Sequence, residues 1–113
     1  MKSPTSLKGG YIFIKESTRY VRVELDDISY VTGLKNYVSI QTKSHRIVTL
    51  QTMKEMEKLL PPHRFSRVHR SYFVAVDKIA FVEKQQIHLK DKTIPIGQLY
   101  LSAFMKKLNN ISL

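Results

Sequence analysis

The sequence contains no cysteine and no tryptophan, and only nine of its 113 residues are acidic. The lack of cysteine excludes disulfides, zinc–thiolate sites and thiol nucleophiles, and it fits a reducing cytoplasm. No apolar run approaches the roughly 20 residues that a membrane-spanning helix needs. The N-terminus, Met1–Thr5, lacks the apolar core of a signal peptide. We therefore expect a cytoplasmic segment without a membrane span.

The sequence also lacks the motifs of common catalytic and metal sites. It has no H-E-x-x-H pattern, no G-x-x-x-x-G-K phosphate loop and no glycine-rich elbow around Ser71. Most of the few acids sit in predicted turns and form no close carboxylate set that would bind a metal. Each histidine is better interpreted as a surface or hydrogen-bonding group than as a metal ligand. We therefore expect no enzymatic activity, no cofactor and no metal.

Positive charge is abundant and unevenly distributed. Nineteen lysines and arginines give a net charge of +10, which points to a polyanionic partner. Residues 35–70 contain only two acids, Glu55 and Glu57, and contribute +6 of this charge. Their basic residues are Lys35, Lys43, Arg46, Lys54, Lys58, Arg64, Arg67 and Arg70. This uneven distribution favours a surface that binds a partner, because charge that only keeps a protein soluble needs no such bias.

A chain of this length is expected to form one domain. Residues 1–10 end in Gly9-Gly10 and are predicted to be a flexible linker, so that residues 11–113 form the domain. Alternating apolar and polar residues between turn signals predict many short strands, and their short connections favour antiparallel pairing. The expected fold class is mainly β, with short antiparallel strands in small sheets. The predicted strands are 11–15, 19–25, 28–32, 37–42, 46–50, 79–83, 87–89 and 93–96, together with two strands within 65–74.

Two helices complete the predicted fold. Thr52 and Glu55 have the spacing of a capping box, which marks the start of a helix. Pro61-Pro62 would end that helix, so we expect it over about residues 52–60. The second helix is expected over about 99–108, because apolar residues recur there at i, i+3, i+4 and i+7. Pro95 should place its strand at a sheet edge.

The stretch from Phe65 to Val74 carries the most concentrated positive charge. Arg67, His69 and Arg70 interrupt two apolar flanks, a pattern that predicts a turn or bulge presenting side chains outward. Arginine suits the O6/N7 edge of guanine. Two further segments follow predicted strands and carry residues that can bind bases or phosphates, namely 33–37 with Lys35 and Asn36, and 97–100 with Gln98 and Tyr100. The three segments together favour nucleic-acid binding.

Several of these motifs occur in the order found in one known family. The chain resembles the LytTR family, the DNA-binding effector domain of many bacterial response regulators, over roughly residues 11–109. The block Phe65-x-Arg67-Val68-His69-Arg70-Ser71-Tyr72, together with the downstream Ile94-Pro95-Ile96-Gly97, is specific to it. The other matching segments are Ile28-Ser29-Tyr30-Val31, Gly33, Asn36-Tyr37-Val38 and Thr49-Leu50-Gln51-Thr52-Met53.

The resemblance implies a mainly β fold whose loops enter successive major grooves, with two protomers on direct repeats and bent DNA. It also implies a receiver domain upstream in a longer parent protein. By position, it implies DNA contacts for the loop at Asn36-Tyr37, for Arg70 and for the segment after Gly97. The chain departs from common family patterns at Thr32, at Ala75 and at Gln98, where many members have an acid, an asparagine and a basic residue respectively.

The function predicted from sequence is therefore binding of double-stranded DNA for transcriptional regulation, by a domain that is monomeric when free and binds DNA as two copies. The candidate base contacts are Asn36, Tyr37, Arg70, Gln98 and Tyr100, and the candidate phosphate contacts are Lys35, Arg46, Arg64, Arg67 and His69. Two alternatives remain open at this point, namely a protein-interaction module that uses a β edge and an RNA-binding domain.

Overall fold

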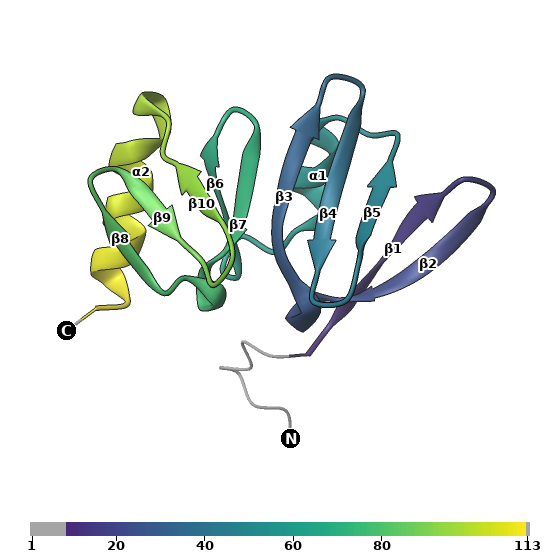
Figure 1. The fold of residues 1–113 in the computed structure, drawn as a ribbon, viewed down its shortest axis with the longest axis horizontal. Helices are drawn as coiled ribbons and strands as arrows, with labels where there is room; N and C mark the ends of the chain where they lie inside the picture. The colour runs from purple at the N-terminus through teal and green to yellow at the C-terminus, as the bar shows by residue number, and fades with distance from the viewer. Residues whose placement is uncertain (1–8, 113) are drawn as a thin grey trace.

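The structure is a computed structural model that describes residues 9–112. The described residues form ten strands in three antiparallel sheets, with two α-helices and two short 3₁₀ turns (Figure 1). The predicted fold class is therefore confirmed. No helix among residues 9–112 has the length and apolar character needed to cross a membrane.

The N-terminal sheet is a two-stranded hairpin of β1 (Tyr11–Glu16) and β2 (Arg19–Glu24). Alternation places Ile12 and Ile14 on its core face. Of the linker predicted over residues 1–10, residues 1–8 lie outside the described part. Gly9 and Gly10 are tied to the domain instead, because the Gly9 amide donates to the Asp26 carboxylate and Gly10 O accepts from the Leu25 amide.

A five-stranded sheet forms the centre of the molecule, with strand order β5-β4-β3-β7-β6. A 3₁₀ turn (Leu25–Asp27) leads into it from β2. The two faces of this sheet contribute to two different hydrophobic cores. In β7, for example, Phe73 packs in the first core and the next residue, Val74, packs in the second. The strands are β3 (Ile28–Leu34), β4 (Tyr37–Thr42), β5 (Arg46–Thr49), β6 (Phe65–His69) and β7 (Tyr72–Ala75).

Helix α1 (Met53–Leu59) belongs to the first core, into which Met56 projects. The predicted capping box is present: Thr52 Oγ1 accepts from the Glu55 amide at 3.1 Å, and Glu55 Oε1 accepts from the Thr52 amide at 2.9 Å. The helix stops before Pro61, as expected for a residue without an amide donor.

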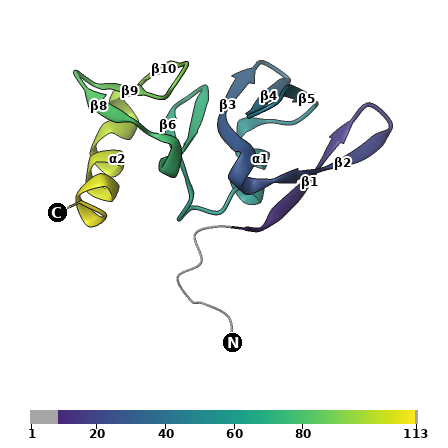
Figure 2. The same ribbon diagram turned by 60° about the horizontal axis from the view of Figure 1, so that its bottom comes forward.

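The third sheet has strand order β10-β9-β8 and covers the second core together with α2. Its strands are β8 (Phe81–Glu83), β9 (Gln86–His88) and β10 (Thr93–Pro95), preceded by a 3₁₀ turn (Val76–Lys78) and followed by α2 (Gln98–Asn110). Pro95 lies in an edge strand, as predicted. Figures 1 and 2 show α1 beside the central sheet and α2 beside the three-stranded sheet.

Most predicted boundaries move by one or two residues in the structure, and three of these changes concern turns and the start of α2. Gly33 belongs to β3, so the break predicted over 33–36 is a two-residue turn at Lys35 and Asn36. The loop predicted at Gln85-Gln86 is a turn at Lys84 and Gln85, both with positive φ, the geometry that suits the twist of a tight hairpin. Helix α2 begins at Gln98, because Gly97 is its N-cap, and it extends to Asn110.

Candidate nucleic-acid interface

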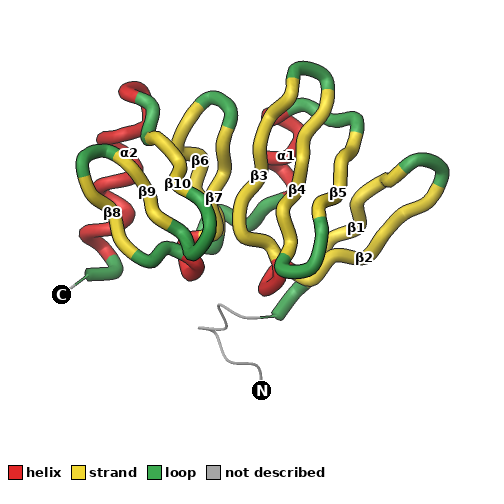
Figure 3. The backbone as a smooth tube through the Cα atoms, in the orientation of Figure 1, coloured by secondary structure: helices red, strands yellow, loops and turns green. Residues whose placement is uncertain are grey.

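Three connections lie along the same edge of the molecule. They are the β3–β4 turn, the β6–β7 turn and the junction between β10 and α2, which Figures 1 and 3 show side by side at the top of the view. They correspond to the three segments that the sequence singled out. We call this surface the three-turn edge.

Backbone hydrogen bonds join the three connections. The Gly33 amide donates to Ser71 O at 2.8 Å, which connects β3 to the β6–β7 turn. The Gly97 amide donates to Val68 O at 2.8 Å, which connects the start of α2 to β6. Gly97 also lies close to its neighbours, since an added Cβ would lie 3.5 Å from His69 Cα. The β6–β7 turn is therefore held from both sides.

The first turn presents its side chains to solvent. Lys35 and Asn36 are exposed, and Lys35 has a φ of 59°, the left-handed conformation that closes this hairpin. Tyr37 begins β4 and is 48% exposed. A charged, an amide and a phenolic side chain thus lie together at this tip.

The second turn lies at Arg70 and Ser71, and it confirms the turn predicted where basic residues interrupt the apolar flanks. Arg70 is exposed and takes part in no ion pair within residues 9–112, and Asp77 lies 3.9 Å from Lys78 instead. A bulge between Arg67 and His69 also confirms the predicted irregularity. The bulge turns Val68 into the second core, which fixes the base of the turn.

Arg67 and His69 make contacts within the protein. Arg67 Nη2 donates to Arg70 O at 2.7 Å, and His69 Nδ1 accepts from the Ser71 amide at 3.0 Å. Both side chains are half-buried. These contacts stabilise the turn, and they engage Arg67 Nη2 and His69 Nδ1 within the protein.

The third segment is the first turn of α2 and not a loop. Gln98 and Leu99 point outward, and Leu99 is 93% exposed. Tyr100 is half-buried and packs toward Gly97, with its ring 3.3 Å from the position of an added Cβ there. The helix thus holds Gln98 at the three-turn edge and turns Tyr100 toward the protein.

Two predicted phosphate contacts lie elsewhere. Arg64 is 7% exposed, and its guanidinium donates to the Asp26 carboxylate and to Gly9 O. Arg46 is exposed and is the first residue of β5. In the strand register it lies opposite Gln41 of β4, near the β4–β5 turn at the far end of these strands. Neither side chain lies at the three-turn edge, where the other exposed candidate residues lie.

The Arg64–Asp26 pair also has an electrostatic effect. Hydrogen bonds from Arg64 and from the Gly9 amide hold the pKa of the Asp26 carboxyl below its ordinary value of 3.8. The charged carboxylate is thus favoured in the fold. The pair stabilises the domain, and the charge of Arg64 is balanced by that of Asp26.

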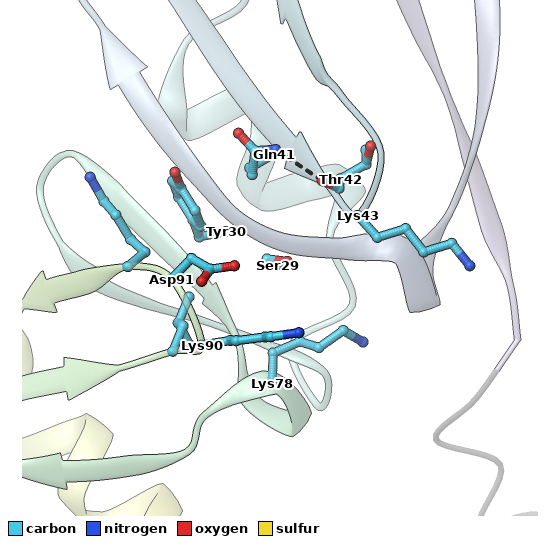
Figure 4. A pocket seen from close by; sticks show the side chains of 10 residues that line it. Ser29, Tyr30, Gln41, Thr42, Lys43, Lys78, Lys90 and Asp91 are labelled. Atoms are coloured by element: carbon cyan, nitrogen blue, oxygen red, sulfur yellow. Dashed lines mark hydrogen bonds between the residues drawn. The ribbon is translucent and has the colours of Figure 1, made fainter.

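A cavity of about 550 Å³ lies between the β4–β5 and β9–β10 turns, at the other end of the sheets. Figure 4 shows lysine side chains around it, but most of them have partners. Lys43 lies 3.4 Å from Asp27, Lys78 donates to Asp26 O, and Lys92 lies over the rings of two tyrosines. Within residues 9–112, no group of three or more histidines and acids is placed to hold a metal ion.

Sequence analysis did not single out the exposed Leu99, nor Leu34, which is 48% exposed and precedes Lys35. A signal for Leu99 was available. It lies outside the apolar pattern of α2 formed by residues 101, 104, 105 and 108, so the helix does not bury it.

Comparisons with known proteins agree with this geometry. The family profile described as the LytTr DNA-binding domain matches residues 18–109. The sensory transduction protein LytT of Bacillus cereus is 29% identical over 94 residues, which are 78% of this chain and 38% of that protein. LytT of Bacillus subtilis is 30% identical over 95 residues, which are 79% of this chain and 39% of that protein. The chain thus spans about two-fifths of the length of these curated relatives.

A solved LytTr DNA-binding domain of Bacillus cereus, described as part of a methyl-accepting/DNA response regulator, has the same fold. It superposes with a TM-score of 0.74 at 22% identity, covering 87% of this chain and 95% of that one. The profile match extends over most of the sequence and includes all three connections of the edge. The chain belongs to the LytTR family of DNA-binding domains.

Proposed function

We propose that the three-turn edge binds double-stranded DNA in a sequence-specific way and that the chain is the DNA-binding output domain of a transcription regulator. One observation carries this proposal: three connections are joined by backbone hydrogen bonds into one edge, with Asn36, Arg70 and Gln98 exposed along it. Membership of a family of DNA-binding domains and the net charge of +10 support the same partner.

Each exposed side chain has a chemical counterpart on a base edge in the major groove. Arg70 can donate two parallel hydrogen bonds to guanine O6 and N7. Asn36 and Gln98 can each make a bidentate pair with adenine. These groups lie on three tightly joined connections, so their relative positions are fixed before DNA binds. A sequence is then recognised by matching all three.

Other residues of the edge supply contacts of lower specificity. Lys35 offers a positive charge at the first turn, which suits a phosphate. The exposed side chains of Tyr37 and Leu99 supply apolar surface that can contact the methyl group of thymine. We propose a supporting role for Tyr100, because its ring packs against the protein.

The parent protein is proposed to be a two-component response regulator that acts in the cytoplasm, with a receiver domain upstream of this module. The names of the relatives and their greater length support this arrangement. The domain is proposed to be monomeric when free and to bind direct repeats as two copies, with centres about one helical turn apart on one face of the DNA. A tight dimer in analytical ultracentrifugation without DNA would contradict this stoichiometry.

The proposed function is tested by selecting bound duplexes from a random pool. The expected result is an enriched motif that occurs twice in the same orientation. Recovery of random sequence would contradict specific recognition, and stronger competition by single-stranded RNA than by duplex DNA would favour an RNA-binding domain.

A protein-interaction module that pairs through a strand edge is less well supported. Both outer strands of the central sheet are covered, since β5 contacts β1 and β6 contacts α2. Thr49 Oγ1 also donates to Lys15 O across the first of these contacts. A salt titration separates the two mechanisms, because DNA binding by counterion release has a steep slope and strand pairing has a shallow one.

A further inference from the structure

Arg67 lies beneath the turn that presents Arg70. It sits in β6 opposite Phe73 of β7, next to the bulge, and its side chain is half-buried. Its Nη2 atom donates to the carbonyl oxygen of Arg70 at 2.7 Å. The guanidinium of one arginine therefore fixes the backbone from which the other projects.

The same guanidinium lies within cation–π distance of two aromatic rings from different elements. Its central carbon is 5.7 Å from the ring centroid of Phe73 in β7 and 5.6 Å from that of Tyr100 in α2. Both distances are within the range of a cation–π contact. Arg67 thus connects the β6–β7 turn to the first turn of α2, where Gln98 lies.

Two of the three guanidinium nitrogens of Arg67 are buried or already bonded within the protein. Its Nε atom is buried and has no hydrogen-bond partner among the described residues. The Nη2 atom is already bonded to Arg70 O. Bidentate binding of a phosphate uses two parallel N–H groups of the guanidinium, and the pair that includes Nε is buried here.

We propose that Arg67 is a positioning residue, which holds the Arg70 turn at a fixed distance from the first turn of α2 and so keeps Arg70 and Gln98 in register with the DNA. This inference rests on the proposed function, in which Arg70 and Gln98 contact bases. It assigns Arg67 an effect on base preference without a direct contact to DNA.

The substitution Arg67→Lys separates this role from phosphate binding. Lysine keeps the positive charge, but it lacks the planar guanidinium that bonds the carbonyl of Arg70 and lies near two rings. A phosphate contact would therefore survive this substitution largely intact. A positioning role would be lost almost as completely as in Arg67→Ala.

The experiment compares Arg67→Lys with the matched control Arg46→Lys, which makes the same exchange at an exposed site away from the edge. Tyr100→Phe and Tyr100→Leu keep and remove the second ring. For each folded variant, binding to the selected duplex, to singly substituted duplexes and to random duplexes is measured across a salt series. The backbone order parameters of Arg70 and Ser71 are measured by NMR in the free domain.

We expect Arg67→Lys and Tyr100→Leu to reduce the preference for the selected duplex by roughly tenfold at the base pairs assigned to Arg70 and Gln98. The salt slope should stay unchanged, because no phosphate contact is lost. The order parameter of Arg70 should fall in Arg67→Lys. Arg46→Lys and Tyr100→Phe should behave like the wild type.

The inference is overturned if Arg67→Lys keeps the wild-type base preference, or if the order parameter of Arg70 is unchanged. A salt slope lower by about one in Arg67→Ala but not in Arg67→Lys would also overturn it, since that pattern identifies a phosphate contact. Failure of the proposed function looks different. Arg70→Ala would then leave base preference intact, while the free Arg67→Lys domain would still show the loss of order at Arg70.

Discussion

The amide nitrogen of Gly33 lies 2.8 Å from the carbonyl oxygen of Ser71. This bond joins the strand that leads to Asn36 with the turn that presents Arg70. It forms at a crowded position, because a Cβ on Gly33 would lie 2.9 Å from Met53 Cγ and 3.8 Å from Ser71 Cα. The 3.8 Å distance is an ordinary contact, so it is the Met53 side chain that packs too closely on residue 33 to leave room for a methyl group.

Gly33→Ala should lower the free energy of unfolding by about 1–3 kcal/mol, as expected for an added methyl group in a packed site. Met53 is the group that must move, so Gly33→Ala and Met53→Ala should be coupled, with the double variant more stable than the sum of the single effects predicts. Urea denaturation of the three variants measures this coupling. Strictly additive effects would show that Met53 is not the obstacle.

Thr52→Ala should lower the free energy of unfolding by about 1 kcal/mol, because it removes the acceptor of the Glu55 amide in the capping box. DNA affinity, measured well below the melting temperature, should barely change. Lys54→Ala, in the same helix but outside the cap, serves as the control for stability. A large loss of affinity in folded Thr52→Ala would place α1 in the interface.

Asp26→Asn should destabilise the domain at neutral pH, and this difference should vanish in acid. The pKa of Asp26 is lower in the folded state than its ordinary value of 3.8, so its contribution is present above that value and is lost as the pH falls through the folded-state pKa. Urea denaturation between pH 7 and pH 2 measures the difference. In an Arg64→Met background the effect of Asp26→Asn should be much smaller at every pH, and an unchanged effect there would contradict the assigned cause.

Lys35→Ala and Arg46→Ala each remove one exposed positive charge, and we expect them to differ. Lys35 lies at the three-turn edge, so its loss should weaken all duplexes about equally and lower the salt slope by roughly one. Arg46 lies at the far end of the strands, so its loss should leave the slope unchanged. Filter binding across a salt series makes the comparison, and equal slopes for the two variants would show that charge acts without regard to position.

The features that sequence predicted well are those fixed by neighbouring residues. The capping box of α1 needs only Thr52 and Glu55, and the edge position of β10 follows from Pro95 alone. The role of Arg64 depends on Asp26 and Gly9, which are 38 and 55 residues away, so composition could not show that its charge is neutralised. Arg46 and Lys35 are both basic residues at or beside the end of a predicted strand, so the sequence does not distinguish them. Only the strand register shows that Arg46 lies at the end of the central sheet opposite the three-turn edge.

The binding of Arg70→Ala tests the central claim most directly. Arg70 projects from a turn that Arg67, Gly33 and Gly97 hold in place, which suits a directional contact to a base. Binding is measured on the selected duplex, on its singly substituted versions and on random duplexes across a salt series. The account predicts a loss of roughly 1–3 kcal/mol on the selected duplex and no remaining preference at one base pair. Equal weakening on every duplex, with base preference intact, would show that Arg70 contacts phosphate and would contradict the account.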